Sequence, residues 1–183
     1  MNAHEMTTSV RTSLGKSGAR KIRAKGQIPA VVYGKGFDSL SISCLPGELK
    51  GIFKTRYGRN SVLHLKQDDG TVILAMLKDV QLHPVSREPE HVDFLRIAED
   101  KPVVVKVPLH LDGRAAGVVE GGTLKQLHRD LPLKCLPKDI PVEVRVDVTA
   151  LKMGEHMHVH SLALPSGTTL ATTEDFAVAS VIH

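Results

Sequence analysis

Strict alternation of apolar and polar residues in the second half of the chain is the feature that most limits its fold. Within VVVKVPLHL, residues 103–111, every second side chain is Val or Leu, and residues 142–148, VEVRVDV, alternate valine with charged residues. Alternation with a period of two residues places apolar side chains on a buried face of a β-strand and polar side chains on a solvent-exposed face. This arrangement is typical of antiparallel sheets. GGTLKQLHRDLPL fits either a helix or a strand, and Pro132 and the strand-rich surroundings favour a strand. We therefore predict a small, all-β, sandwich-like domain over residues 98–183.

The first half mixes strands with helical patterns. IPAVVYG predicts a buried strand that Pro29 opens and Gly34 ends. LPGELKGIFKTRYG predicts an amphipathic helix with Pro46 in its first turn and Gly58 at its end. NSVLHLKQ and TVILAMLKDVQL, joined by Asp-Asp-Gly, predict a hairpin, and a proline-bearing loop, HPVSREPEH, leads to a last strand, VDFLRI. Together these elements predict a small α+β barrel or an open sheet over residues 1–97.

Charge is unevenly distributed along the chain. Residues 1–97 carry 15 Lys or Arg against 9 Asp or Glu, a net charge of +6, whereas residues 98–183 carry 9 against 11, a net charge of −2. The reversal begins at the acidic AEDK, residues 98–101, where we place the domain boundary. Residues 11–36 hold seven basic side chains and no acidic one. This sorting indicates a polyanionic partner for the first domain. The alternative is a solvated lysine-rich surface, although such surfaces usually interleave acids.

The basic stretch contains GKS, residues 15–17, which raises the question of a nucleotide-phosphate loop. That loop needs Gly-x4-Gly-Lys-[Ser/Thr] between a strand and a helix. Here Val10 stands at the position of the first glycine, and the upstream TTSVRTSL contains no glycine. Backbone amides therefore cannot wrap a phosphate in the way that the loop requires, and nucleotide hydrolysis is disfavoured.

Binding of nucleic acid explains the basic stretch, residues 11–36, better than binding of a nucleotide. A short helix is expected over residues 17–25, with Ser17 as its cap and Gly26 as its terminator. Arg20 and Arg23 lie three residues apart and share a helical face, from which each can meet a phosphate oxygen. Aromatic residues make up only 3% of the chain, which argues against a single-strand binder that stacks bases. The pattern favours recognition of a structured RNA duplex through phosphates, groove shape and hydroxyls.

Other kinds of site find less support. Two of the three histidines in HMHVH, residues 156–160, could share a zinc ion on a strand face, but all three could not, and a solvated face is the alternative. Cys44 and Cys135 lack a metal-type spacing and a catalytic partner, so we expect reduced thiols, no cofactor and no enzymatic activity. The chain has no apolar run that would span a membrane and no signal-peptide layout. We expect a cytoplasmic protein whose polar segment before Ser9 is loose.

Four stretches, in order along the chain, resemble one protein family. RTSLGKSGARKIRAKGQIPAVVYGKG is similar to the N-terminal signature of the twenty-fifth bacterial large-subunit ribosomal protein. In that signature Gly-Lys-Gly-Ala-Ala-Arg-Arg-Leu-Arg precedes Gly-x-Ile-Pro-Ala-Val-Val-Tyr-Gly. Further matches are GRNSVLHL, KDVQLHPVSREPEHVDFLRI and GVVEGGTLKQLHRDLPLKCLPKDIP. The likeness spans about residues 9–180 and fits the long form of the family, called general stress protein CTC.

The resemblance implies a structural constituent of the large ribosomal subunit that binds 5S ribosomal RNA. In the family the N-terminal domain is a small β-barrel with helices, which docks on the loop E region and reads a widened minor groove. The C-terminal β-domain is expected to contact neighbouring ribosomal components, with the protein monomeric within the ribosome and away from membranes. The RNA contacts implied position by position are Arg11, Lys16, Arg20, Arg23, Tyr33, Gln81, His83, His91 and Asp93, to which we add the basic Lys21, Lys35 and Arg87.

Two positions depart from the family pattern, and one of the implied contacts is an acid. Ser17 interrupts the usual Gly-Lys-Gly, which bears on the backbone path, and Ala19 stands where some members carry Ser, which removes one possible hydrogen bond. Asp93 is an acid in a basic surface. It could accept from a base amino group or an RNA hydroxyl, orient a histidine, or be satisfied by backbone at the start of a strand.

Two other functions stay open. The chain could be a free stress protein that binds other structured RNAs, which ribosome co-sedimentation from growing and starved cells would separate from a ribosomal role. It could also be a metal-binding module built on His156 and His158. Elemental analysis of the purified protein distinguishes that case.

Overall fold

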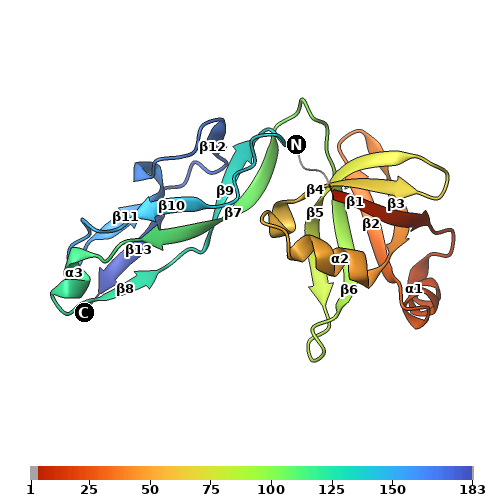
Figure 1. Cartoon of the computed structure of the whole chain (residues 1–183), viewed down its shortest axis with the longest axis horizontal. Helices are drawn as coiled ribbons and strands as arrows, with labels where there is room; N and C mark the ends of the chain where they lie inside the picture. Colours follow the sequence, from red (N-terminus) through yellow and green to blue (C-terminus); the bar gives the residue numbers. More distant parts are fainter. Residues whose placement is uncertain (1–3, 183) are drawn as a thin grey trace. The chain divides into compact units, whose positions relative to one another are not determined.

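The computed structural model describes residues 4–182 and divides into two compact units (Figure 1). The first unit ends at Lys101 and the second begins at Pro102. Strands dominate both units, so the predicted mainly β fold is confirmed. Among the residues described, no helix is long and apolar enough to cross a membrane.

The first unit is a closed barrel with helices outside its strands. Its elements are β1 (His4–Val10), α1 (Gly15–Ala24), β2 (Ile28–Gly34), β3 (Phe37–Cys44), α2 (Pro46–Phe53), the 3-10 turn η1 (Gly58–Asn60), β4 (Val62–Gln67), β5 (Val72–Leu82) and β6 (Pro89–Arg96). The strands follow one another around the barrel in the order β1-β3-β2-β6-β5-β4. β1 runs parallel to β4 and β2 parallel to β6, whereas the other neighbours are antiparallel. Closure decides between the two predicted arrangements in favour of the barrel.

Alternate side chains of the strands fill the barrel. Ala30 and Val32 of β2 and Val92 and Phe94 of β6 are buried in one core, to which α2 adds Leu49. Each large apolar side chain buried in this way contributes roughly 1.5–3 kcal/mol relative to its exposure. Because side chains alternate across a strand, the residues between these positions face outward.

The part of the segment before Ser9 that the structure describes is a β-strand, contrary to the prediction. Of this segment the structure describes residues 4–8, which belong to β1 and close the barrel. Met6 and Thr8 are each 1% exposed, and the Thr8 hydroxyl donates a hydrogen bond to the Lys66 carbonyl at 3.2 Å. The segment looks polar because one of its two inward positions is a threonine whose hydroxyl is satisfied by backbone.

Two predicted helix ends are also wrong. Ser17 is not the cap of α1, since the helix begins at Gly15 after an extended Leu14 and no side chain caps it. α2 ends at Phe53, and Gly58 instead opens η1 with a φ of +50°. By contrast, the start of α2 at Pro46 is confirmed.

The end of α1 matches the prediction. Gly26 has a φ of +74°, a conformation that favours glycine. Its N–H donates to the Arg23 carbonyl at 2.9 Å, and the Gln27 N–H donates to the Ile22 carbonyl at 3.2 Å. These two bonds form a Schellman motif, which stops the helix and sends the chain into β2.

The second unit consists of two small sheets. Its elements are β7 (Val103–Asp112), α3 (Ala116–Val119), β8 (Thr123–Gln126), β9 (Asp130–Cys135), β10 (Val144–Asp147), β11 (His156–His158), the 3-10 turn η2 (Val159–Ser161), β12 (Thr168–Leu170) and β13 (Ala177–Ile182). One sheet has the order β10-β7-β9-β12 and the other β11-β13-β8. GGTLKQLHRDLPL forms strands β8 and β9, as predicted. The antiparallel prediction is wrong for β10, which runs parallel to β7. Alternation of apolar and polar residues indicates that one face of a strand is exposed to solvent, but it does not indicate the direction of the neighbouring strand.

The buried thiols of the two units offer a test of their independence. Cys44 on β3 is 2% exposed and Cys135 on β9 is 3% exposed. Burial raises the pKa of the Cys44 thiol from 9.0 to about 12, with a smaller contribution from the Glu48 carboxylate, and burial also raises the pKa of Cys135. A protonated, covered thiol does not react as a nucleophile.

We predict that neither thiol reacts with an aromatic disulfide reagent at pH 8 until its own unit unfolds. The variants Cys44→Ala and Cys135→Ala each leave one thiol, so labelling in increasing denaturant reports one unit at a time. The thiols of the unfolded chain ionise near pH 9, whereas the buried thiols stay protonated there. We therefore also expect the free energy of unfolding to fall as the pH rises above about 9. Labelling of the native protein as fast as that of the unfolded chain would contradict the prediction.

Candidate RNA interface

Three adjacent strands carry polar side chains on the outer face of the barrel. Asp79 on β5 lies opposite Asp93 on β6, and Gln81 lies opposite His91. Tyr33 on β2 lies near the same carboxylates, since Asp93 and Asp79 both act on its ionisation. These five residues, which we call the polar barrel face, come from three separate stretches of sequence. Asp79 was not among the predicted site residues, because nothing in the sequence sets it apart from other strand acids.

Histidine and carboxylate pair on this face. Nδ1 of His91 lies 2.8 Å from Oδ1 of Asp93, and both side chains are partly exposed. This contact does not have the geometry of a hydrogen bond. The Nδ1 atom of His91 is buried and has no hydrogen-bond partner among the described residues. Of the three roles open to Asp93, the structure shows the contact with a histidine. Burial, and then the nearby Asp93 and Asp79, raise the pKa of Tyr33, so its hydroxyl is protonated at neutral pH and can donate a hydrogen bond.

Helix α1 supplies the positive charge beside this face. Its basic residues Lys16, Arg20, Lys21 and Arg23 are all exposed. The Arg23 guanidinium donates through Nε and Nη2 to the Glu90 carbonyl, at 3.1 and 2.9 Å. This fork ties the helix to the start of β6, immediately before His91. The predicted basic helix and the polar barrel face are therefore held together by a contact between side chain and backbone.

Two of the predicted basic residues, Arg11 and Lys35, lie outside the basic cluster on α1. Arg11 follows β1, and its Nε is buried without a hydrogen-bond partner. Lys35 lies in the turn after β2, at the end of that strand away from α1. A strand of this length spans roughly 20 Å, so Lys35 does not join the cluster on the helix.

The loop between β5 and β6, residues 83–88, is held together by His83. The ring Nδ1 of His83 accepts hydrogen bonds from the backbone N–H groups of Val85 and Ser86, at 3.3 and 3.1 Å. The His83 N–H donates to the Glu88 carbonyl at 2.8 Å. Arg87 in this loop has a φ of +59°, a left-handed conformation that is uncommon for a residue other than glycine. Only the Nε2 side of His83 is left for an external contact.

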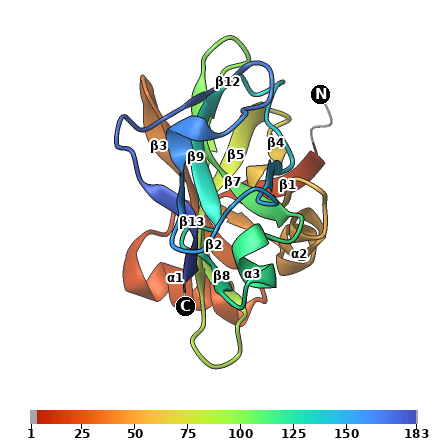
Figure 2. The same cartoon turned by 90° about the vertical axis from the view of Figure 1, so that its left-hand side faces the viewer.

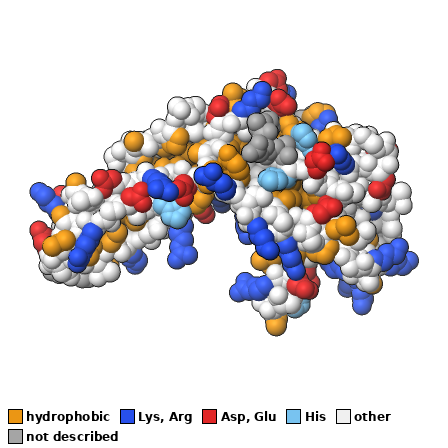
Figure 3. Space-filling model, in the orientation of Figure 1, with side chains coloured by type: hydrophobic (Ala, Val, Ile, Leu, Met, Phe, Trp, Pro, Cys, Tyr) orange, Lys and Arg blue, Asp and Glu red, His pale blue; other side chains and the backbone are white. Residues whose placement is uncertain are grey.

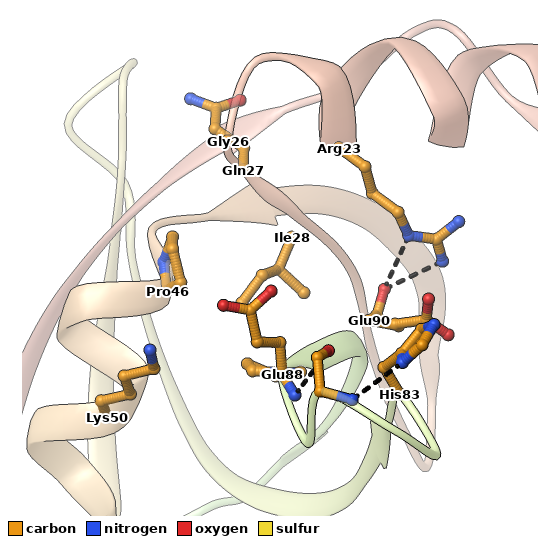
Figure 4. A pocket seen from close by; sticks show the side chains of 11 residues that line it. Arg23, Gly26, Gln27, Ile28, Pro46, Lys50, His83, Glu88 and Glu90 are labelled. Atoms are coloured by element: carbon orange, nitrogen blue, oxygen red, sulfur yellow. Dashed lines mark hydrogen bonds between the residues drawn. The ribbon is translucent and has the colours of Figure 1, made fainter.

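Helix α1 and this loop project at the same end of the barrel (Figures 1 and 2). Lys and Arg side chains are prominent over both elements in the space-filling view (Figure 3). A pocket of about 330 Å³ opens between the end of α1, the start of α2 and the loop (Figure 4). It is lined by Arg23, Gly26, Gln27, Ile28, Pro46, Lys50, His83, Ser86, Glu88, Pro89 and Glu90. Sequence patterns do not reveal it, because its walls come from segments that become neighbours only on folding.

The histidines of the second unit are arranged differently from the prediction. His156 and His158 lie on β11, but His160 lies in η2, so the three do not share a strand face. Nδ1 of His158 lies 3.0 Å from Oδ2 of Asp175. Within residues 4–182, no group of three or more potential metal ligands converges.

Known proteins match both units of the chain. Residues 6–94 match the Ribosomal L25p family, and residues 102–183 match the C-terminal domain of ribosomal protein TL5. The large ribosomal subunit protein bL25 of Sorangium cellulosum is 35% identical over 181 residues, which cover 99% of this chain and 79% of that protein. The bL25 protein of Syntrophotalea carbinolica is 39% identical over 180 residues, covering 97% and 86% of the two chains.

A third relative shares almost its entire length. The bL25 protein of Geobacter sulfurreducens is 36% identical over 184 residues, covering 99% of this chain and 94% of that protein. The pairing of an L25p domain with a TL5-type C-terminal domain corresponds to the long form expected from the sequence. The chain therefore belongs to the bL25 family of large ribosomal subunit proteins, whose members are structural proteins and not enzymes.

Proposed function

We propose that the chain binds 5S ribosomal RNA in the large ribosomal subunit, at the loop E region, through α1 and the polar barrel face. The observation that carries the proposal is the Arg23 fork on the Glu90 carbonyl. It holds the exposed basic helix beside Tyr33, His91 and Asp93. Positive charge for phosphates and neutral or acidic groups for base edges and hydroxyls thus lie on one rigid surface.

The two parts of this surface have different tasks. Arg20 forms no ion pair or hydrogen bond with any residue in the range 4–182, so its guanidinium is available to a phosphate or a base edge. The polar barrel face is built on three adjacent strands of the barrel, and its side chains can enter the wide, shallow minor groove of an RNA helix. Tyr33 can donate and Asp93 can accept there, and a 2′-hydroxyl can do both.

The second unit has a different partner in this proposal. Residues 98–183 have a net charge of −2, which gives no electrostatic attraction for phosphates. We assign this unit to neighbouring components of the subunit, with the protein present as one copy. Binding to other structured RNAs away from the ribosome is the second candidate, because a basic helix by itself does not select one RNA.

Arg20→Ala tests the helix. We expect it to weaken binding to a 5S RNA fragment containing loop E by about 1–3 kcal/mol if Arg20 reads a base edge. If Arg20 meets only phosphate, the slope of log affinity against log salt should fall by about one and specificity should persist. The measurement is a titration at two salt concentrations, with a plain duplex of equal length for comparison. Arg114→Ala, an exposed arginine in the second unit, is the matched control.

The outcomes of these RNA titrations distinguish the two candidate functions. An unchanged affinity and salt slope for Arg20→Ala would remove the helix from the interface. Equal binding of the wild-type protein to the loop E fragment and the plain duplex, collapsing as salt rises, would favour the second candidate.

His83→Ala and His83→Asn together test whether His83 positions the loop. An Asn side-chain oxygen can take the place of Nδ1 as acceptor, whereas Ala cannot. We expect His83→Ala to speed amide exchange at Val85 and Ser86 and to weaken RNA binding by about 0.5–1.5 kcal/mol, the worth of a typical hydrogen bond. His83→Asn should preserve both. Equal losses of affinity in the two variants without a change in exchange would instead mean that the ring contacts RNA directly.

A further inference from the structure

The pocket beside the β5–β6 loop holds charged groups that the interface described above does not use. Glu88 extends from the loop toward Ile28 and Pro46, and Lys50 approaches from α2 (Figure 4). Neither the Glu88 carboxylate nor the Lys50 amino group forms an ion pair or hydrogen bond with another residue of the described chain. Ile28 is only 4% exposed and gives the pocket an apolar wall, with Pro46 on the α2 side. The site thus combines an acceptor, a donor and apolar surfaces.

The balance of charge limits what this pocket can take. Arg23 and Lys50 supply two positive charges, and Glu88 and Glu90 supply two negative ones. A phosphate would be repelled by the carboxylates, and a lysine or arginine side chain would be repelled by the cations. A neutral ring that carries donors and acceptors on different edges meets both signs favourably. The volume of about 330 Å³ lies at the small end of ligand sites and suits a single nucleoside.

We propose that this pocket takes one unpaired guanine base, an inference that rests on the proposed RNA-binding function. Guanine presents two parallel donors, N1–H and the N2 amino group, which match the two oxygens of the Glu88 carboxylate. Its O6 and N7 acceptors suit the Lys50 amino group, and its ring faces suit Ile28 and Pro46. Adenine and cytosine each offer one amino donor beside an acceptor on the corresponding edge, so they pair with a carboxylate through one bond only.

The position of Glu88 supports a specific contact. A carboxylate at a surface that binds RNA repels phosphates, and at this end of the barrel it lies near the basic helix α1. Hydrogen bonds between Glu or Asp and base amino groups are an established way for acids to contribute to nucleic-acid recognition. The two hydrogen bonds to His83 Nδ1 and the bond from the His83 N–H to the Glu88 carbonyl hold the backbone of the loop at Glu88 before any ligand arrives, which lowers the entropic cost of binding.

Chemical probing of guanine tests the inference. A 1,2-dicarbonyl reagent of the kethoxal type modifies N1 and N2 of unpaired guanines, the two atoms assigned to Glu88. We expect the full-length protein to protect one unpaired guanine of 5S ribosomal RNA, and Glu88→Gln to restore its reactivity while weakening RNA binding about fivefold or more. Asp68→Asn, which removes an exposed acid in the β4–β5 turn, should leave protection and affinity unchanged. Equal protection by wild type and Glu88→Gln, or none by wild type, overturns the inference.

A second arm separates RNA from free nucleotide and this inference from the proposed function. Guanosine and adenosine monophosphates are titrated into the full-length protein, with the amide resonances of Ile28 and Glu88 as readout. If 5S RNA binds without a guanine that responds to Glu88→Gln, the pocket inference fails and the proposed function stands. If 5S RNA does not bind, the proposed function fails. A preference for the guanine nucleotide that Glu88→Gln abolishes then keeps the pocket as a site for free nucleotide, and equal or absent binding of the two nucleotides overturns it.

Discussion

Closure of the barrel by β1 is the constraint on which the rest of the first unit depends. β1 pairs with β3 on one side and with β4 on the other, so it covers two strand edges that would otherwise be open to pairing with another chain. It also brings Met6 and Thr8 into the core. The same pairing fixes the position of Val10, only a few residues before α1 begins. The basic helix is therefore bracketed by two barrel strands, β1 and β2, and its place is set by the sheet.

The Arg23 fork adds the second constraint. Both of its hydrogen bonds end on the carbonyl of residue 90, so they do not depend on the side chain at that position. Hydrogen bonds from a charged group contribute about 1.5–3 kcal/mol, and these join α1 to β6 across 67 positions in the sequence. The cost is that one arginine of the helix is partly committed to structure. This leaves Arg20 as the freer of the two residues that share the predicted face.

Sequence patterns reveal elements whose buried positions are apolar and fail where a polar residue stands inward. β2, β5 and β7 were predicted because valine, isoleucine and leucine occupy their inward positions. β1 was missed because Thr8 is one of its inward residues, and β3 begins with exposed FDS and buries Ser43. The basic helix and most candidate residues were predicted, yet their convergence required the register of β5 and β6. The pairing of His83 Nδ1 with backbone N–H groups and the pocket around Glu88 have no signal in the sequence, since both depend on loop geometry.

In the proposed RNA complex, charge and shape recognition come from different elements of the barrel domain, and this separation has a physical consequence. α1 holds four cations on a helix with no acid in its first turn, so its contribution falls steeply as salt rises. The polar barrel face pairs its one histidine with Asp93 and carries a second acid, Asp79. Repulsion between these acids and phosphates decreases with salt, while hydrogen bonds to base edges and hydroxyls are less screened. A duplex that offers only phosphates gains from the helix and is penalised by the acids. An RNA whose groove presents donors to Asp93 and Asp79 would gain from both, so under the proposed function the acids on this basic protein provide selectivity against ordinary duplexes.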